Sequence, residues 1–118
     1  MPFGAPITQL PKTSLAGIDV YVHDDGSSQV LFMELGADRA AVTVPTHTHG
    51  VEWGTVVEGE IEMTIGERVE LHPAGTQHLI AAQVPHSFRF RPGTSSIHCF
   101  GERRITLPGR STPVRGPA

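Results

Sequence analysis

The residues most able to do chemistry lie close together near the middle of the chain. His47 and His49 are two positions apart, and Glu52 follows three positions later. Side chains at positions i and i+2 of a strand point to the same face, so two imidazoles placed this way can bind one metal ion at about 2.0–2.2 Å. Simple alternation would turn Glu52 away, but a bulge or turn at Gly50-Val51 would bring its carboxylate back. The alternative is an exposed histidine pair beside a loop.

The residues around this pair resemble the first motif of the cupin family, H-x-H-x(3,4)-E-x(6)-G. His47, His49, Glu52 and Gly59 stand at the matching positions, with two residues instead of three between His49 and Glu52. A Trp-Gly pair directly after the acidic residue is also found in small cupins, and here it is Trp53-Gly54.

A second stretch resembles the second cupin motif, G-x(5)-P-x-G-x(2)-H. Gly75 and His86 stand at the two ends of a segment of the right length, whereas Ala81 and Gln83 replace the inner Pro and Gly. The two motifs come in the expected order, and the resemblance covers roughly residues 30–100.

The resemblance implies an all-β fold, the double-stranded β-helix (a jelly-roll-like barrel). It also implies that His47, His49, Glu52 and His86 bind one divalent metal ion. Three neutral imidazoles and one carboxylate suit Fe, Mn, Ni, Cu or Zn and do not suit Mg or Ca. Four protein ligands on an octahedral ion would leave two positions open for a substrate or dioxygen.

This ligand set leaves two classes of function open. One is a metal-dependent enzyme, dioxygenase- or isomerase-like, that acts on a small organic molecule. The other is a non-catalytic module that binds or senses a small molecule, with a structural or lost metal. The fold supports many chemistries and does not choose between them.

Other side chains could also serve a site in the barrel. His78, eight residues before His86, could act as an acid/base group in the pocket, or it could cap the barrel mouth. If the run 95–100 alternates, either His98 or Cys99 faces inward. Cys99 is expected to be a small buried filler. Trp53 could close the pocket wall or belong to the core.

Short β-strands must position these residues. Thirteen Gly and ten Pro indicate many turns, and no helical period of ten or more residues appears. Apolar or alternating runs predict an all-β sandwich or barrel. Pro45 is expected to end the third strand, and Glu58-Gly59-Glu60 to form a hairpin or a sharp bend. The predicted strands are 18–23, 29–35, 40–44, 51–57, 61–65, 68–71, 77–80, 86–91 and 95–100.

One domain, residues 1–118, is the simplest organisation. Within it we expect an extended N-terminal arm at 1–16, the core motifs at 30–100 and a C-terminal tail at 106–118. The arm could cover a sheet edge of a partner, which predicts a homodimer. From Gly101 onward there are four arginines and one acid, a basic end that is either solvated or able to meet phosphate or an acidic neighbour.

Composition limits the remaining partners. The net charge of −3 gives no reason to expect nucleic acid. Cys99 is the single cysteine, so no intrachain disulfide can form, as is usual in a reducing compartment. No secretory signal and no stretch of about 20 apolar residues is present, so we expect a cytoplasmic protein without a membrane partner.

Overall fold

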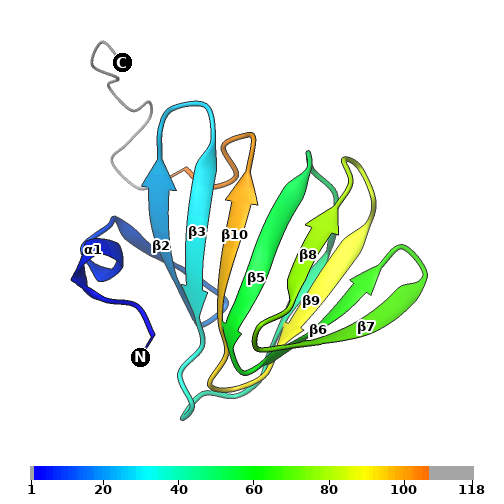
Figure 1. Ribbon diagram of the computed structural model, residues 1–118, viewed down its shortest axis with the longest axis horizontal. Coiled ribbons are helices and arrows are strands. Elements are labelled where there is room, and N and C mark those ends of the chain that lie inside the picture. The colour runs from blue at the N-terminus through cyan, green and yellow to red at the C-terminus, as the bar shows by residue number, and fades with distance from the viewer. Residues whose placement is uncertain (1, 107–118) are drawn as a thin grey trace.

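The computed structural model describes residues 2–106, and within them ten short strands and one short helix form two layers (Figure 1). The tail expected at 106–118 therefore lies almost entirely outside the described residues. The elements, in chain order, are α1 (Ala5–Thr8), β1 (Lys12–Leu15), β2 (Ile18–Asp24), β3 (Gln29–Glu34), β4 (Val42–His47), β5 (Glu52–Glu58), β6 (Glu60–Ile65), β7 (Arg68–Pro73), β8 (Gln77–Ile80), β9 (His86–Phe90) and β10 (Ser95–Phe100).

The strands form two antiparallel sheets. The larger sheet has the order β1-β2-β3-β10-β5-β8, and the smaller has the order β4-β9-β6-β7. The last strand, β10, lies between β3 and β5, so segments far apart in the sequence are neighbours in the larger sheet (Figure 1). The all-β fold predicted from the sequence is confirmed.

Inward-facing apolar side chains from both sheets form one core. On β6, Ile61 and Met63 are fully buried while the residues between and beside them are only partly buried. Phe88 and Phe90 alternate in the same way with the exposed Arg89 on β9. Burying each such side chain contributes roughly 1.5–3 kcal/mol, so the alternation fixes which face of each strand turns inward.

The segment Glu58-Gly59-Glu60 is a sharp bend and not a hairpin, because β5 and β6 belong to different sheets. Gly59 has a φ of +75°, and a Cβ atom there would lie 2.7 Å from Cα of Thr94. Only glycine fits both conditions. The bend lets one chain segment pass from the larger sheet to the smaller one, which closes the barrel at this corner.

Pro45 was expected to end the third strand, but it lies within that strand. β4 continues to His47, and its register on β9 shifts between Val44 and His47. β4 is an edge strand of the smaller sheet, where a proline without an N–H group removes no needed ladder bond. As a result His47 stays on the strand and pairs directly with His86.

The N-terminal arm is not extended throughout, and its strand joins the larger sheet of the same chain. It contains α1 and β1, and β1 pairs with β2 of the same chain. Phe3 packs edge-on against Phe32, with ring centroids 5.7 Å apart. Across residues 2–106 there is no helix with the length and apolar character needed to cross a membrane.

Candidate metal centre

Three histidines meet at one end of the space between the two sheets. The register of β4 on β9 places His47 opposite His86, and His49 follows just after β4 ends. The ring centroids are 4.3 Å apart for His47 and His86, and 4.6 Å apart for His49 and His86. One ring nitrogen from each histidine lies within 4.8 Å of the others. His49 and His86 are buried, and His47 is partly exposed at the rim.

Backbone carbonyl groups fix the tautomers of these rings. Each of the three histidines has its Nδ1 within hydrogen-bond distance of a carbonyl oxygen, which can only accept. Nδ1 therefore carries the hydrogen, and Nε2 of the neutral ring presents a lone pair. Burial lowers the pKa of His86, which favours this neutral form. The acceptors are Pro45 for His47 at 2.7 Å, Gly50 for His49 at 2.6 Å and Val84 for His86 at 2.9 Å.

The Nε2 atoms of His49 and His86 face each other at 2.9 Å. With both Nδ1 atoms acting as donors, two lone pairs meet here without a hydrogen between them. A cation bound to both nitrogens would resolve this conflict. The Oε1 atom of Glu52 lies 3.3 Å from Nε2 of His49 and 3.7 Å from Nε2 of His86. The donor set thus fits a transition metal ion.

A bend at Gly50 turns Glu52 into the barrel, as the short spacing required. β4 ends at His47 and β5 begins at Glu52, so the connection is not bound to strict alternation. The N–H of Gly50 donates to the carboxylate of Glu102, which follows β10. Glu52 is only 1% exposed, so its carboxylate faces the interior.

A row of residues across three strands of the larger sheet holds the other carboxylate oxygen. The register aligns His98 on β10 with Gly54 on β5, and Gly54 with His78 on β8. Glu52 is two residues from Gly54 on the same face, so its side chain reaches the gap between the two histidines. Its Oε2 accepts hydrogen bonds from Nε2 of His78 at 2.7 Å and Nδ1 of His98 at 2.8 Å.

These hydrogen bonds decide the charge of Glu52. Burial alone would raise the pKa of its carboxyl, but the bonds from His78 and His98 outweigh burial and hold that pKa well below its usual range. Burial lowers the pKa of His78, which keeps this ring neutral. Glu52 is therefore an anion whose Oε1 lies near Nε2 of His49 and of His86, while its Oε2 is held by His78 and His98.

His98 is the inward member of the pair at 98–99, and its sequence context alone indicates no role for it. Its Nδ1 donates to Glu52, so its Nε2 accepts from the hydroxyl of Ser96 at 2.8 Å. The alternation along 95–100 indicated that either His98 or Cys99 faces inward, but the sequence did not show which of the two. Cys99 lies on the other face and is partly buried, and burial raises the pKa of its thiol.

The structure places His78 and Trp53 on opposite faces of the larger sheet. His78 is buried behind Glu52 and is not among the residues that line the pocket next to the histidines. Trp53 lies neither in the pocket wall nor in the core, because it faces outward and is 58% exposed. The neighbouring Gly54 faces inward, as alternation requires.

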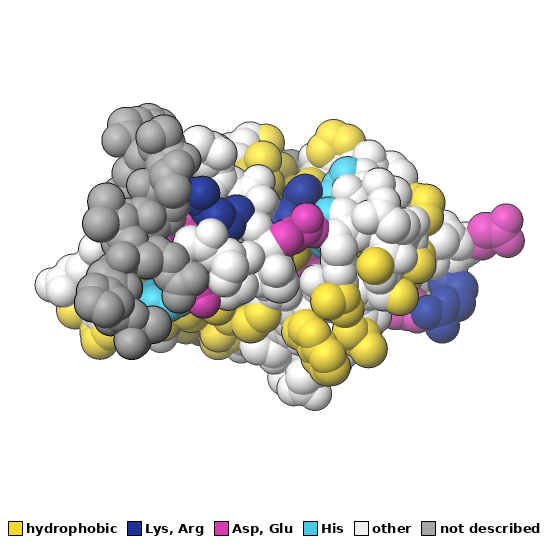
Figure 2. All heavy atoms as spheres, turned by 90° about the horizontal axis from the view of Figure 1, so that it is seen from above, with side chains coloured by type: hydrophobic (Ala, Val, Ile, Leu, Met, Phe, Trp, Pro, Cys, Tyr) yellow, Lys and Arg dark blue, Asp and Glu magenta, His cyan; other side chains and the backbone are white. Residues whose placement is uncertain are grey.

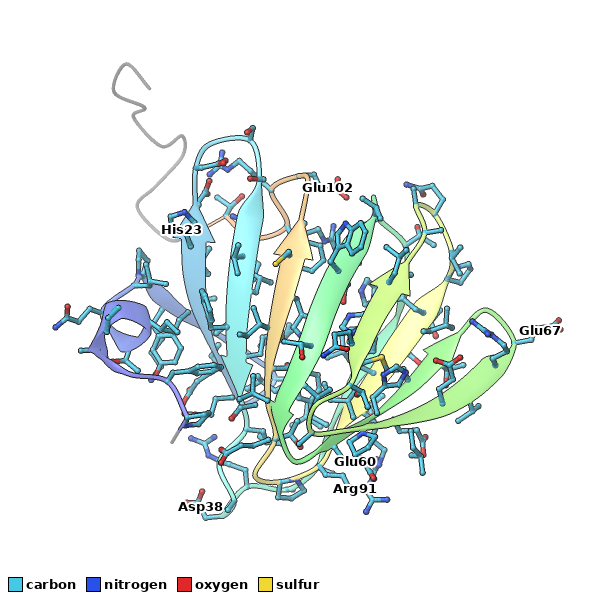
Figure 3. The ribbon with its side chains drawn as sticks, viewed as in Figure 1. His23, Asp38, Glu60, Glu67, Arg91 and Glu102 are labelled. Carbon is cyan, nitrogen blue, oxygen red and sulfur yellow. The ribbon has the colours of Figure 1, made fainter. Side chains whose placement is uncertain are left out.

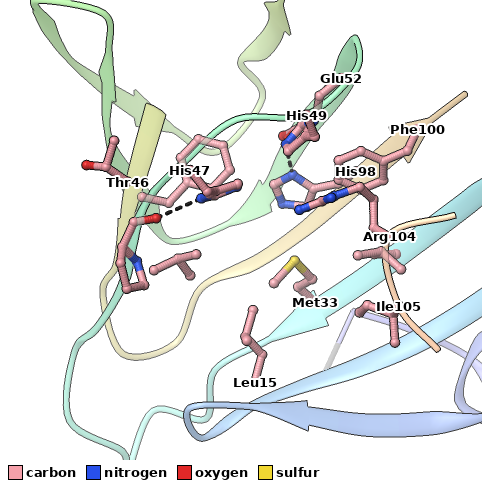
Figure 4. A pocket seen from close by; sticks show the side chains of 14 residues that line it. Leu15, Met33, Thr46, His47, His49, Glu52, His98, Phe100, Arg104 and Ile105 are labelled. Carbon is pink, nitrogen blue, oxygen red and sulfur yellow. Dashed lines mark hydrogen bonds and ion pairs between the residues drawn. The ribbon is translucent and has the colours of Figure 1, made fainter. Parts of the chain in front are cut away.

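A cavity of about 350 Å³ adjoins the histidines (Figure 4). His47, His49 and Glu52 form one side of it, and His98 contributes next to them. Most of the remaining wall is apolar, and Arg104 is the additional charged residue. The apolar lining residues are Leu15, Leu31, Met33, Val44, Pro45, Phe88, Phe100 and Ile105.

Several solved structures share this fold. A RmlC-like cupin from Shewanella frigidimarina has a TM-score of 0.72 at 18% identity, over 88% of this chain and 91% of that chain. KdgF from a Halomonas species has a TM-score of 0.70 at 16% identity, over 82% and 90%. A variant oxalate decarboxylase from Bacillus subtilis has a TM-score of 0.69 at 15% identity, over 85% of this chain and 29% of that one.

The sequence itself also matches a family model. No curated protein matches the chain as a relative. The model described as "Cupin domain" matches residues 31–99, which is more than half of the sequence and nearly the range expected from the two motifs. With the two antiparallel sheets and the solved structures, this match confirms the double-stranded β-helix. The chain belongs to the cupin family.

Proposed function

We propose that this protein is a metal-dependent enzyme that acts on a small organic molecule. His47, His49, Glu52 and His86 bind one divalent transition metal ion, one of Fe, Mn, Ni, Cu or Zn. The observation that supports this most directly is the pair of Nε2 lone pairs of His49 and His86, 2.9 Å apart beside a buried carboxylate. The cavity next to them has room for a small ligand.

Such an ion would supply Lewis-acid or redox chemistry, of the dioxygenase or isomerase kind. The protein residues do the positioning. His78 and His98 hold the carboxylate of Glu52 in one orientation, and the mostly apolar wall favours the hydrocarbon part of a ligand. The acid/base role expected for His78 from the sequence stays a prediction, whereas its place behind Glu52 supports a positioning role.

One observation favours the alternative, a module that binds or senses a small molecule with a structural or lost metal. The titratable lining residues are His47, His49, Glu52, His98 and Arg104. Of these, the first three belong to the proposed ligand set, and His98 is fixed to Glu52. No separate acid/base group therefore stands in the described pocket wall. A metal-free preparation that binds an organic acid as well as the metal-loaded protein does would favour this alternative.

Metal analysis tests the primary proposal. We expect protein expressed without a His-tag, in medium supplemented with Fe, Mn, Ni, Cu and Zn, to contain about one equivalent of transition metal by mass spectrometry. His49→Ala should lose most of it, because one of four ligands and the lone pair facing His86 are gone. His23→Ala is the control, since His23 is exposed on β2 (Figure 3). Wild-type protein without stoichiometric metal would refute the proposal.

We also propose a homodimer, formed through the outer face of the larger sheet. Trp53 and Leu79 are paired neighbours on β5 and β8, and they are 58% and 54% exposed. Adjacent exposed apolar side chains of this size are typical of interaction surfaces. Light scattering coupled to size exclusion should give twice the chain mass, and a monomer would contradict this.

A cytoplasmic location stays a prediction, supported by the single cysteine.

A further inference from the structure

The chain crosses the mouth of the pocket just after β10. Residues 103–105, here called the C-terminal strap, are held by the buried side chain of Gln29 on β3. Oε1 of Gln29 accepts from the N–H groups of Arg104 at 2.7 Å and Ile105 at 2.9 Å, and its Nε2 donates to the carbonyl of Ile105 at 2.7 Å. Three hydrogen bonds to one buried amide fix the backbone of the strap.

The two neighbouring arginines of the strap have different surroundings. Nε of Arg103 donates to Oδ2 of Asp24 at 3.0 Å, and that oxygen also accepts from Gln29. Burial would raise the pKa of Asp24, but hydrogen bonds from Gly26, Gln29 and Arg103 hold it below its usual value. Arg104 is exposed, makes no ion pair with any carboxylate in residues 2–106, and lines the pocket.

Arg104 therefore brings a positive charge to a mostly apolar cavity. Figure 4 shows it beside Phe100 and Ile105, on the side of the pocket that the strap forms, with its side chain directed toward the histidines. Seen from above, the space-filling view shows basic, acidic and histidine side chains close to one another, with apolar side chains around them (Figure 2). A guanidinium in such a place is stabilised by a planar anion, which it can bind through two parallel hydrogen bonds.

The charge of the proposed metal centre also favours an anionic ligand. A divalent ion held by one carboxylate and three neutral histidines carries a net charge of about +1, and Arg104 adds another positive charge at the same cavity. Positive charges beside an apolar-walled pocket attract an anionic ligand. The apolar wall, with Leu15, Met33 and Phe88 among its residues, favours hydrocarbon for the rest of that ligand.

We propose that Arg104 binds the carboxylate of a small, largely apolar organic acid that occupies this pocket. The contact deepens the proposed function by naming the substrate class of the same site, and it rests on that function only for the end of the ligand that faces the metal. A carboxylate is favoured over a phosphate because the strap offers one guanidinium, which balances one negative charge. An organic phosphate shares the anion chemistry and is included in the test.

Calorimetry on the metal-free protein tests Arg104 without help from the metal. The probes are phenylacetate and hexanoate, the neutral phenylacetamide, and phenyl phosphate. We expect Arg104→Gln to weaken binding of the two acids at least about tenfold and to leave phenylacetamide unchanged, because a charged hydrogen-bonded pair is lost. Arg104→Lys should retain part of the affinity, since it keeps the charge but not the planar pair of donors. Arg89→Gln, on the exposed face of β9, should bind like wild type.

Three results would overturn the assignment: wild type that binds neither acid, Arg104→Gln that binds both as well as wild type, or phenyl phosphate that binds more tightly than phenylacetate. Repeating the titrations with metal-loaded protein separates this proposal from the proposed function. Protein that takes up no metal but binds phenylacetate through Arg104 keeps this inference and refutes the metal enzyme. Protein that takes up metal but binds phenylacetate equally well with and without Arg104 keeps the proposed metal site and refutes this inference. Thermal unfolding of each variant checks that the strap remains folded.

Discussion

Glu52→Gln should abolish metal binding while leaving the metal-free protein about as stable as wild type. The glutamine oxygen can take the place of Oε2 and accept from His78 and His98 as before. Its NH₂ group then replaces Oε1 and faces the Nε2 lone pairs of His49 and His86, 3.3 and 3.7 Å away. An amide N–H donates to these nitrogens in the metal-free protein and cannot coordinate a cation. Metal content should fall below a tenth of the wild-type value.

Glu52→Ala is the matched comparison, because it removes the acceptor as well as the ligand. Buried donors on His78 and His98 would then lack a partner, at a cost of about 1–3 kcal/mol for each group left unsatisfied. Urea unfolding of the metal-free proteins should therefore rank Glu52→Ala well below both wild type and Glu52→Gln. Glu67→Gln, at the tip of the β6–β7 hairpin, should change neither readout (Figure 3). If Glu52→Gln retains full metal content, Glu52 is not a ligand and the site reduces to the three histidines.

Local sequence patterns predicted most of the strands, and the resemblance of the two motifs to the cupin family implied how those strands are arranged. Strands such as 77–80 and 95–100 have the bounds that their alternation indicated, because one face of each strand must be buried. The spacing of His47 and His49 predicted two rings on one face, and both rings lie beside that of His86. The bend that Glu52 required is present at Gly50. The prediction failed at Pro45, since only the position of β4 at a sheet edge makes a proline harmless there.

The parts of the site that depend on pairing between distant strands could not be predicted. The row His98–Gly54–His78 exists because β10, β5 and β8 are neighbours in one register, and nothing local to any of the three residues states that register. The strap is similar: Gln29 and Arg104 lie 75 positions apart, and a basic segment near the end of a sequence looks like a solvated tail. The sequence therefore indicated the proposed metal ligands better than it indicated the residues that hold those side chains in place.

Gly54 is the residue where this hidden support can be tested with the smallest change. A Cβ atom on Gly54 would lie 2.7 Å from Nε2 of His78 and 2.8 Å from the carbonyl oxygen of Ile97. The His78 ring could swing away only by giving up its hydrogen bond to Glu52, and Ile97 is backbone in the neighbouring strand. Gly54→Ala should therefore lower the free energy of unfolding by about 1–3 kcal/mol. Loss of the support behind a ligand should also weaken metal binding roughly 10–100-fold.

Gly101→Ala is the matched control for this substitution, because a Cβ atom there meets nothing within 4 Å. Urea unfolding and competitive metal titration of both variants give the two readouts. The double variant Gly54→Ala/His78→Ala separates the two causes of damage. If the clash with His78 dominates, the double variant should be less destabilised than the sum of the single changes, since the ring that obstructs Cβ is gone. If Gly54→Ala keeps wild-type stability and metal affinity, His78 does not need the space that the missing side chain of Gly54 leaves. That result would refute the positioning role of the His98–Gly54–His78 row.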